Sequence, residues 1–160
     1  MLPAAAVRRT LAVAPWATSD AAMVPPSAEV LRCVPHRAPI LRVHTVVAND
    51  GLQADVLGEE PDGPGRLPWA AGAIEGLAQS AALLLAHGLA AAPGDGPRQG
   101  MLVAVKRFTV AQTPPPQATI AYHVRLVRRL GPTALVSGHA EALGVRLAAG
   151  ELTLWTSTGA

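Results

Sequence analysis

The sequence predicts an α+β fold in which one long central helix is wrapped by an antiparallel sheet of five to six strands, with a short helix before it. Half of the 160 residues are hydrophobic and 15% are charged, so the chain can build a core and is not disordered throughout. One long helical segment is apolar on nearly every side, and such a helix has to be buried. Extended segments punctuated by Gly and Pro flank it, and a sheet made from them would cover it.

The N-terminal part is expected to differ from the rest of the chain. We expect residues 1–26 to form a poorly ordered tail and residues 27–158 to form a single domain, which suits a chain of this length. Ser27 follows two prolines and is a suitable N-cap for a short helix that ends near Cys33. Cys33 is the only cysteine in the sequence, which excludes an internal disulfide and a cysteine-built zinc site and fits a reducing cytoplasm.

A β-hairpin is predicted next. Residues 40–48 read as an extended segment, and residues 49–51 read Asn-Asp-Gly, which is a strong short-range hairpin signal. Residues 52–57 then form the returning strand. The following stretch, residues 58–68, contains three glycines and three prolines and is predicted to be a loop.

The long helix is predicted over residues 70–92, because this segment is rich in Ala and Leu and is followed by Gly and Pro. Four extended segments come after it, at residues 101–111, 118–129, 134–144 and 145–156. A hairpin, one buried helix and four long strands make up the hot-dog arrangement. An uncovered sheet edge is an aggregation hazard, so we expect an edge strand to pair with a second subunit.

Two sets of motifs carry a family resemblance. Residues 34–41 read Val-Pro-His-Arg-Ala-Pro-Ile-Leu, and Leu-Pro-Trp at residues 67–69 precedes Ile-Glu-Gly-Leu-Ala-Gln at residues 74–79. In this order they resemble the hot-dog 3-hydroxyacyl-(acyl-carrier-protein) dehydratases, over residues 28–157. The Leu-Pro-Trp variant is similar to a predicted-dehydratase branch of the aryl polyene type. The resemblance implies removal of water from a β-hydroxyacyl thioester in fatty-acid or polyene-type biosynthesis, with no cofactor and with an acyl-carrier-protein-bound substrate.

Glu75 is the outstanding candidate for this chemistry. It is the sole acid in the predicted helix, and apolar surroundings disfavour the ionised form of a carboxylic acid, which suits a proton donor. The alternative is an ordinary first-turn Glu that the helix dipole stabilises. Gln79 lies on the same helix face and could hydrogen-bond Glu75 or satisfy nearby backbone. Backbone N–H groups near Gly72 would stabilise the developing enolate oxygen. The predicted substrate-binding residues are Pro68, Trp69, Gly72, Ala73 and Gln79.

The base that removes the substrate proton is missing from its usual place. The resemblance implies a His in a Gly-His-Phe-Pro loop ahead of the helix, but residues 58–63 contain no His. His36, in the Pro-His-Arg motif, is the candidate base, and a hydrogen-bonded loop anchor is the alternative role for it. Glu60 or Asp62 could also act as the base, although a loop rich in Pro and Gly favours solvated carboxylates.

Cations are concentrated in the second half of the chain. Residues 98–129 include six Lys and Arg residues and no acid, and such a block attracts acidic partners. A carrier protein is the acidic partner that the resemblance implies, and a solvated sheet face is the alternative. The predicted docking residues are Lys106, Arg107, Arg125, Arg128 and Arg129. We predict no nucleic-acid partner, because aromatics make up only 3% of the residues, and no membrane partner, because no apolar run is long enough.

Several alternatives stay open. The chain could be a hot-dog subunit with a degraded site that binds acyl chains or pairs with an active homologue, or a hot-dog thioesterase whose helix carboxylate activates water. We expect a homodimer, or a heterodimer with a related hot-dog subunit, in the cytoplasm. No metal site is predicted, because no two histidines have the helical spacing of metal ligands, and His44, His123 and His139 fall in predicted strands.

Overall fold

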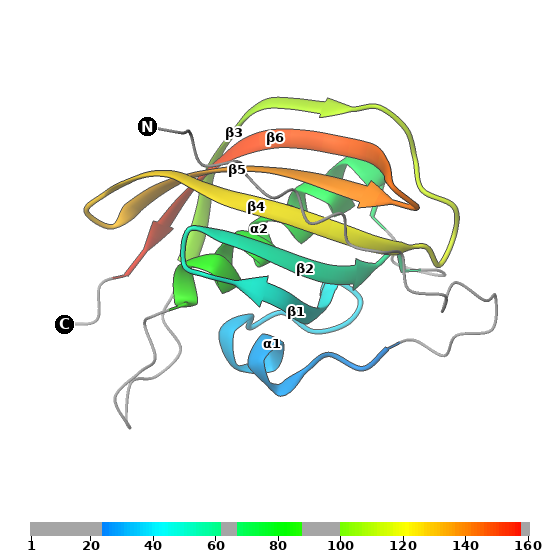
Figure 1. The fold of residues 1–160 in the computed structure, drawn as a ribbon, viewed down its shortest axis with the longest axis horizontal. Helices are drawn as coiled ribbons and strands as arrows, with labels where there is room; N and C mark the ends of the chain where they lie inside the picture. Colours follow the sequence, from blue (N-terminus) through cyan, green and yellow to red (C-terminus); the bar gives the residue numbers. More distant parts are fainter. Residues whose placement is uncertain (1–23, 62–66, 88–99, 158–160) are drawn as a thin grey trace, which may run out of the picture.

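Six strands and two helices make up the described part of the chain in the computed structural model, which covers residues 24–61, 67–87 and 100–157 (Figure 1). They are α1 (Ala28–Cys33), β1 (Val43–Asn49), β2 (Gln53–Glu59), α2 (Trp69–Ala86), β3 (Gly100–Val110), β4 (Thr119–Leu130), β5 (Thr133–Ala142) and β6 (Val145–Thr156). The strands form one antiparallel sheet in the order β1-β2-β4-β5-β6-β3. The sheet curls around α2, which confirms the predicted fold class.

The short helix α1 begins where the sequence predicts. Its N-cap is Ser27, whose hydroxyl accepts a hydrogen bond from the backbone N–H of Val30. The backbone N–H of Ser27 donates to the carbonyl of His44, so the start of α1 is joined to β1. Residues 1–23 of the predicted tail lie outside the described residues, whereas the backbone N–H of Val24 already donates to Glu59.

The hairpin of β1 and β2 follows the Asn-Asp-Gly signal. The Asp50 carboxylate accepts hydrogen bonds from the backbone N–H groups of Leu52 and Gln53, and Gly51 has a φ of 83°, which favours glycine. These hydrogen bonds hold the pKa of Asp50 below its usual value. The loop predicted from residue 58 begins later than expected, because Gly58 and Glu59 still pair with β4.

Helix α2 begins at Trp69 and ends at Ala86. His87 has extended backbone angles and closes the helix ahead of Gly88, so the predicted end at residue 92 is wrong by several residues. It is the only helix in the described ranges that is long and apolar enough to cross a membrane, and 61% of it is buried inside the protein. This burial is typical of the core helix of a soluble protein, as the apolar pattern predicted.

The core lies between α2 and the concave face of the sheet. Leu77 on α2 and Ile120, Tyr122, Val136 and Leu152 on the sheet are fully buried. Successive residues of a strand point to opposite faces, so the residues between these sheet positions form the outer face. One face of α2 is less covered: Ala71 is exposed, and Glu75, Ala78 and Ala82 are half-buried.

The two edge strands of the sheet are β1 and β3. Within the described residues, β3 pairs only with β6, so one of its edges has no strand beside it. Met101, Val103 and Val110 of β3 are exposed apolar residues. An exposed apolar edge strand of this length is a ready template for pairing with another chain.

Candidate active site

Glu75 lies near the N-terminal end of α2, on its less covered face. Its side chain is 26% exposed, so it sits at the protein surface without facing bulk solvent. Its Oε1 atom accepts a hydrogen bond of 2.8 Å from Nε2 of Gln79, which lies one helical turn further on. The spacing of the two residues allows this hydrogen bond and leaves bonding to nearby backbone as the alternative, and Gln79 does both in the structure.

His36 comes to the same place from the connection between α1 and β1. Its Nε2 atom lies 3.7 Å from Oε1 of Glu75, and its side chain is 44% exposed. Arg37 shapes this connection by donating from Nη1 to the carbonyls of Val34 (2.9 Å) and His36 (2.7 Å). Within the described residues the His36 ring forms no hydrogen bond, so it is not the hydrogen-bonded loop anchor considered above. The two candidate catalytic residues are therefore neighbours.

Gln79 holds α2 against the connection between α1 and β1. Its side chain is almost fully buried, and Oε1 accepts a hydrogen bond of 2.9 Å from the backbone N–H of Arg42. Its Nε2 atom donates to the carbonyl of Ile40 at 3.0 Å as well as to Glu75. One amide side chain thus joins α2 to the segment that leads from His36 into β1. Its place in the structure is that of a positioning residue.

The free backbone donors of α2 lie earlier than the sequence predicts. The N–H of Gly72 already donates to the carbonyl of Pro68, at 3.0 Å. Within the described residues, the unpaired N–H groups of the first turn therefore belong to Trp69, Ala70 and Ala71, because Pro68 is the N-cap and has no N–H. Ala70 and Ala71 are exposed, and Trp69 is buried. Gly72 is thus not a free donor for an oxyanion, which corrects its expected role.

A buried ion pair, which sequence reasoning missed, lies behind this end of the helix. Nη1 of Arg42 is 3.2 Å from Oε2 of Glu60, and both side chains are fully buried. The guanidinium packs against Gly72, where an added Cβ atom would lie only 3.0 Å from Cζ of Arg42. Gly72 is therefore explained by close packing against Arg42. Ala73 is likewise fully buried in the core.

Glu60 was expected to be a solvated loop carboxylate, and this expectation is wrong. Its side chain has no exposed surface, because it compensates the Arg42 charge beneath the positive end of the α2 dipole. Such a carboxylate cannot reach a substrate at the surface, so Glu60 is not the base. Asp62 lies outside the described residues. The sequence signal for this pair was an Arg in the otherwise apolar run at residues 40–43.

Tyr122 completes the buried polar group. Its ring lies against Gly76 of α2, where a Cβ atom would overlap it. Burial raises the pKa of the Tyr122 phenol. The Arg42 charge opposes this rise, whereas the Glu60 charge adds to it. The hydroxyl therefore stays protonated. Its hydroxyl has no hydrogen-bond partner among the described residues.

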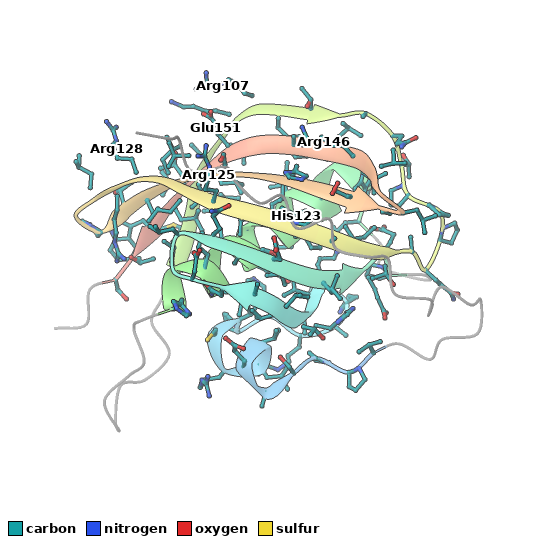
Figure 2. All side chains as sticks on the ribbon, viewed as in Figure 1. Arg107, His123, Arg125, Arg128, Arg146 and Glu151 are labelled. Atoms are coloured by element: carbon teal, nitrogen blue, oxygen red, sulfur yellow. The ribbon has the colours of Figure 1, made fainter. Side chains whose placement is uncertain are left out.

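The five predicted docking cations lie on β3 and β4. Figure 2 shows three of them, Arg107, Arg125 and Arg128. Arg107 is highly exposed and forms an ion pair of 2.8 Å with Glu151 of β6. Arg125, Arg128 and Arg129 are exposed along β4, toward its hairpin with β5, and form no ion pair within the described ranges. Lys106 is also exposed. Arg98, the remaining cation of the block, lies outside the described residues.

Neither a protein-family model nor a curated protein matches this sequence. Solved structures do match. The dehydratase heterocomplex ApeI:P from Xenorhabdus doucetiae is similar with a TM-score of 0.67 at 18% identity, covering 81% of this chain and 91% of that one. The virulence protein Cj0977 from Campylobacter jejuni matches with a TM-score of 0.60 at 8% identity, covering 82% of this chain and 97% of that one. A mutant of the thioesterase PA1618 from Pseudomonas aeruginosa matches with a TM-score of 0.52 at 11% identity, covering 69% of this chain and 78% of that one. These are hot-dog proteins, and this chain has the hot-dog fold.

Proposed function

We propose that this protein is a dehydratase that removes water from β-hydroxyacyl thioesters carried by an acyl carrier protein. The observation that carries the proposal is the pairing of His36 with Glu75, at 3.7 Å, on the accessible face of α2. A dehydratase needs one group that takes a proton from the carbon beside the thioester carbonyl and one that protonates the leaving hydroxyl. An imidazole and a carboxylic acid, held side by side, supply these two functions.

The reaction follows from this arrangement. His36 removes the α-proton, the C–O bond at the β-carbon breaks, and Glu75 gives its proton to the departing hydroxyl, which leaves as water. The products are the unsaturated thioester, protonated His36 and ionised Glu75. Because the two side chains are close together, the proton can return from His36 to Glu75 through a short rotation or one water molecule. Acid and base lie on one side of the substrate, so the elimination is syn.

The first turn of α2 supports the developing enolate. The N–H groups of Ala70 and Ala71 have no partner within the described residues, and both residues are exposed at the positive end of the helix dipole. The acyl chain would follow the less covered face of α2, where Ala78 and Ala82 leave room beside Glu75. A second subunit paired at β3 would close this face over the chain. The exposed cations of β3 and β4 would bind the acidic carrier protein.

Mass spectrometry of a β-hydroxyacyl carrier substrate incubated with the full chain tests this proposal. We expect loss of one water. Glu75→Gln and His36→Gln should each slow the reaction about 100-fold or more, the range for loss of a general acid or base. His87→Gln, an exposed His at the end of α2, is the matched control and should keep the full rate. Full dehydration by either site variant would overturn the assignment of that residue.

A partner subunit is the second candidate. The similarity to a dehydratase heterocomplex favours it, because a subunit in such a complex can support an active homologue. In that case the chain alone would leave the substrate unchanged, and activity would need the second subunit. Hydrolysis of the thioester in the same assay would instead identify a thioesterase, the activity of another similar structure.

Pairing of two chains at β3 has its own test. Val103 is exposed near the middle of this edge strand, so Val103→Lys should convert a dimer to monomers in light scattering. Val47→Lys, on the opposite edge strand β1, is the matched control because Val47 is about equally exposed. A dimer that survives the substitution in β3 and dissociates with the one in β1 would place the interface at β1.

A further inference from the structure

The outer face of the sheet, opposite α2, carries a second group of polar side chains. Asp55 of β2, His123 of β4 and His139 of β5 are directly opposite one another across the three neighbouring strands. Their neighbours in sequence, such as Tyr122 and Ala140, point inward and are fully buried. Strand pairing therefore sets these three side chains in one row on the outer face, independently of the candidate active site.

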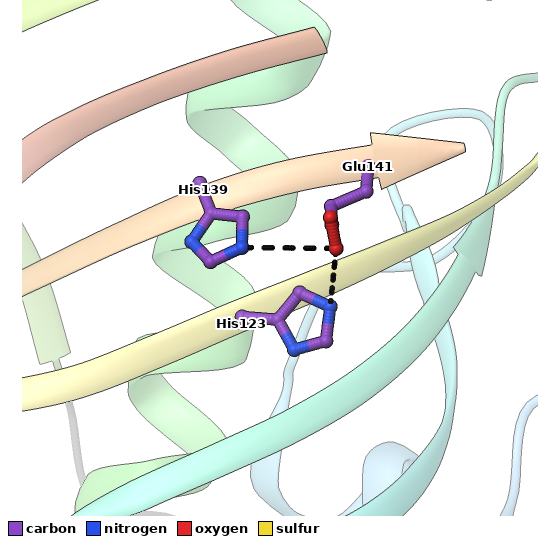
Figure 3. Close-up of side chains that lie close together, drawn as sticks. All are labelled: His123, His139 and Glu141. Atoms are coloured by element: carbon purple, nitrogen blue, oxygen red, sulfur yellow. Dashed lines mark ion pairs between the residues drawn. The ribbon is translucent and has the colours of Figure 1, made fainter. Parts of the chain in front are cut away.

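Glu141 joins this row from β5, two residues after His139 and so on the same face. Its Oε1 atom is 3.4 Å from Nε2 of His123 and 3.9 Å from Nε2 of His139 (Figure 3). The two imidazole rings are stacked, with centroids 4.8 Å apart. All three ligating atoms lie within 4.8 Å of one another. Two imidazole nitrogens and one carboxylate oxygen therefore lie close enough together to share one ion.

We propose that His123, His139 and Glu141 bind a divalent transition-metal ion of the Zn²⁺ class. Imidazole nitrogen and carboxylate oxygen are ligands that Zn²⁺ accepts, and three protein ligands leave a fourth position for water. Metal–ligand bonds of about 2.1 Å at tetrahedral angles put the ligand atoms about 3.4 Å apart. The two contacts of Glu141 are already at or near this separation, so only small side-chain rotations are needed.

Asp55 gives independent support for a metal site. Its Oδ1 atom is 2.7 Å from Nδ1 of His123, the ring nitrogen that faces away from Glu141. A carboxylate that accepts a hydrogen bond from Nδ1–H holds the lone pair on Nε2, the nitrogen aimed at the metal position. This carboxylate–histidine–metal arrangement is usual at zinc sites, where it orients the ring and raises its basicity.

His123 and His139 border a depression on this face of the sheet. The charged residues that line it are Asp55, Glu151, Arg107, Arg125 and Arg146, so the three ligands and Asp55 have to compensate the charge of the ion themselves. The depression has a volume of about 540 Å³ and is open to solvent, which gives the ion a path of entry.

Zn²⁺ binding by the full chain tests the proposal. The protein is stripped with EDTA, exchanged into metal-free buffer, loaded with ZnCl2 and passed through gel filtration before metal analysis. We expect one Zn²⁺ per chain, titratable by calorimetry, and Co²⁺ loading should give the visible absorption of a tetrahedral site. Asp55→Asn should weaken binding about 10- to 100-fold, as loss of such a supporting carboxylate does elsewhere.

Variants of the ligands decide the outcome. His123→Gln and His139→Gln should each abolish retention of Zn²⁺, whereas His87→Gln, a His outside the row, should keep it. Circular dichroism checks that each variant is folded, which is expected because both ligands are partly exposed in the sheet. Zn²⁺ retained unchanged by the double variant His123→Gln/His139→Gln, or no Zn²⁺ retained by the unsubstituted chain, would overturn the proposal.

Discussion

Nε2 of Gln79 lies 2.8 Å from Oε1 of Glu75, and the same amide group also holds the backbone of Ile40 and Arg42. A single buried side chain therefore connects the candidate acid to the segment that carries His36. The distance between His36 and Glu75 depends on this connection, because the His36 ring has no hydrogen bond within the described residues and only the His36 carbonyl is held, by Arg37. Gln79 is accordingly as important for the geometry of the site as for the fold.

Removing the Gln79 amide should destabilise the protein. Gln79→Ala leaves the buried N–H of Arg42 without its acceptor, and an unsatisfied buried group costs about 1–3 kcal/mol. Urea unfolding should show a loss of this size, and the proposed dehydration should slow because Glu75 loses its partner. Gln112→Ala is the matched control, because Gln112 is exposed and uses only its backbone N–H, so its effect should stay within about 0.5 kcal/mol. Equal losses in the two variants would contradict this role.

Much of the fold could be predicted from local signals. The Asn-Asp-Gly turn specifies the first hairpin, and the apolar pattern of α2 specifies a helix that a sheet has to cover. The contact of Glu75 with Gln79 follows from helical spacing alone. The meeting of His36 with Glu75 required the whole fold, although both residues stood out in the sequence because of the motifs around them.

Close packing of Tyr122 against Gly76 gives a second prediction. Ala favours helices over Gly by about 1 kcal/mol, so a Gly→Ala change in a helix with free space should stabilise it. At Gly76 the new Cβ would overlap the Tyr122 ring, and overpacking a core typically costs about 1–3 kcal/mol. Gly76→Ala should therefore lower the urea midpoint, whereas Gly100→Ala, where a Cβ meets only ordinary contact, should leave it nearly unchanged. Stabilisation by Gly76→Ala would show that the ring does not fill this space.

The two Arg–Glu pairs found in the described part of the chain differ in burial, and this gives a third prediction. Glu60→Gln leaves the fully buried Arg42 guanidinium without its compensating charge, which costs about 3–5 kcal/mol when such a pair is broken. Glu151→Gln breaks the pair with the highly exposed Arg107, which is worth less than about 1 kcal/mol. Thermal and urea unfolding of both variants measure the difference. Similar losses would mean that water reaches Arg42.

Sequence reasoning missed the Arg42–Glu60 pair and the His123–His139 pair for the same physical reason. Each pair is brought together by the pairing of two strands, although its residues are distant in sequence. Arg42 and Glu60 meet because β1 and β2 are paired and α2 covers them. The apolar run at residues 40–43 marks Arg42 as unusual, but no local pattern indicates that Glu60 is its partner. His123 and His139 were judged by helical spacing, whereas a sheet brings together residues that are far apart in sequence. Cross-strand partners become visible only when the strand order is known.

His44 should make stability depend on pH. Its side chain is largely buried in β1, and this burial lowers its pKa, while Glu59 and a backbone hydrogen bond to Gly58 partly oppose the change. In the unfolded chain a His has a pKa of about 6.5. Below that pH the unfolded state binds a proton that the folded state does not, until the pH reaches the folded pKa. The stabilisation is therefore complete above about pH 6.5 and is lost as the pH falls from there to the folded pKa.

Urea unfolding between pH 8 and pH 5 measures this effect. The free energy of unfolding should fall below about pH 6.5, with a slope from His44 of at most about 1.4 kcal/mol per pH unit, the limit for one proton. His44→Gln removes one titrating group and should reduce the slope in this window, leaving the part that belongs to His139, whose pKa burial also lowers. His87→Gln is the matched control, because His87 is an exposed His at the end of α2 and its loss should leave the slope unchanged. A steep slope that persists in His44→Gln would show that another buried group takes up the proton on unfolding.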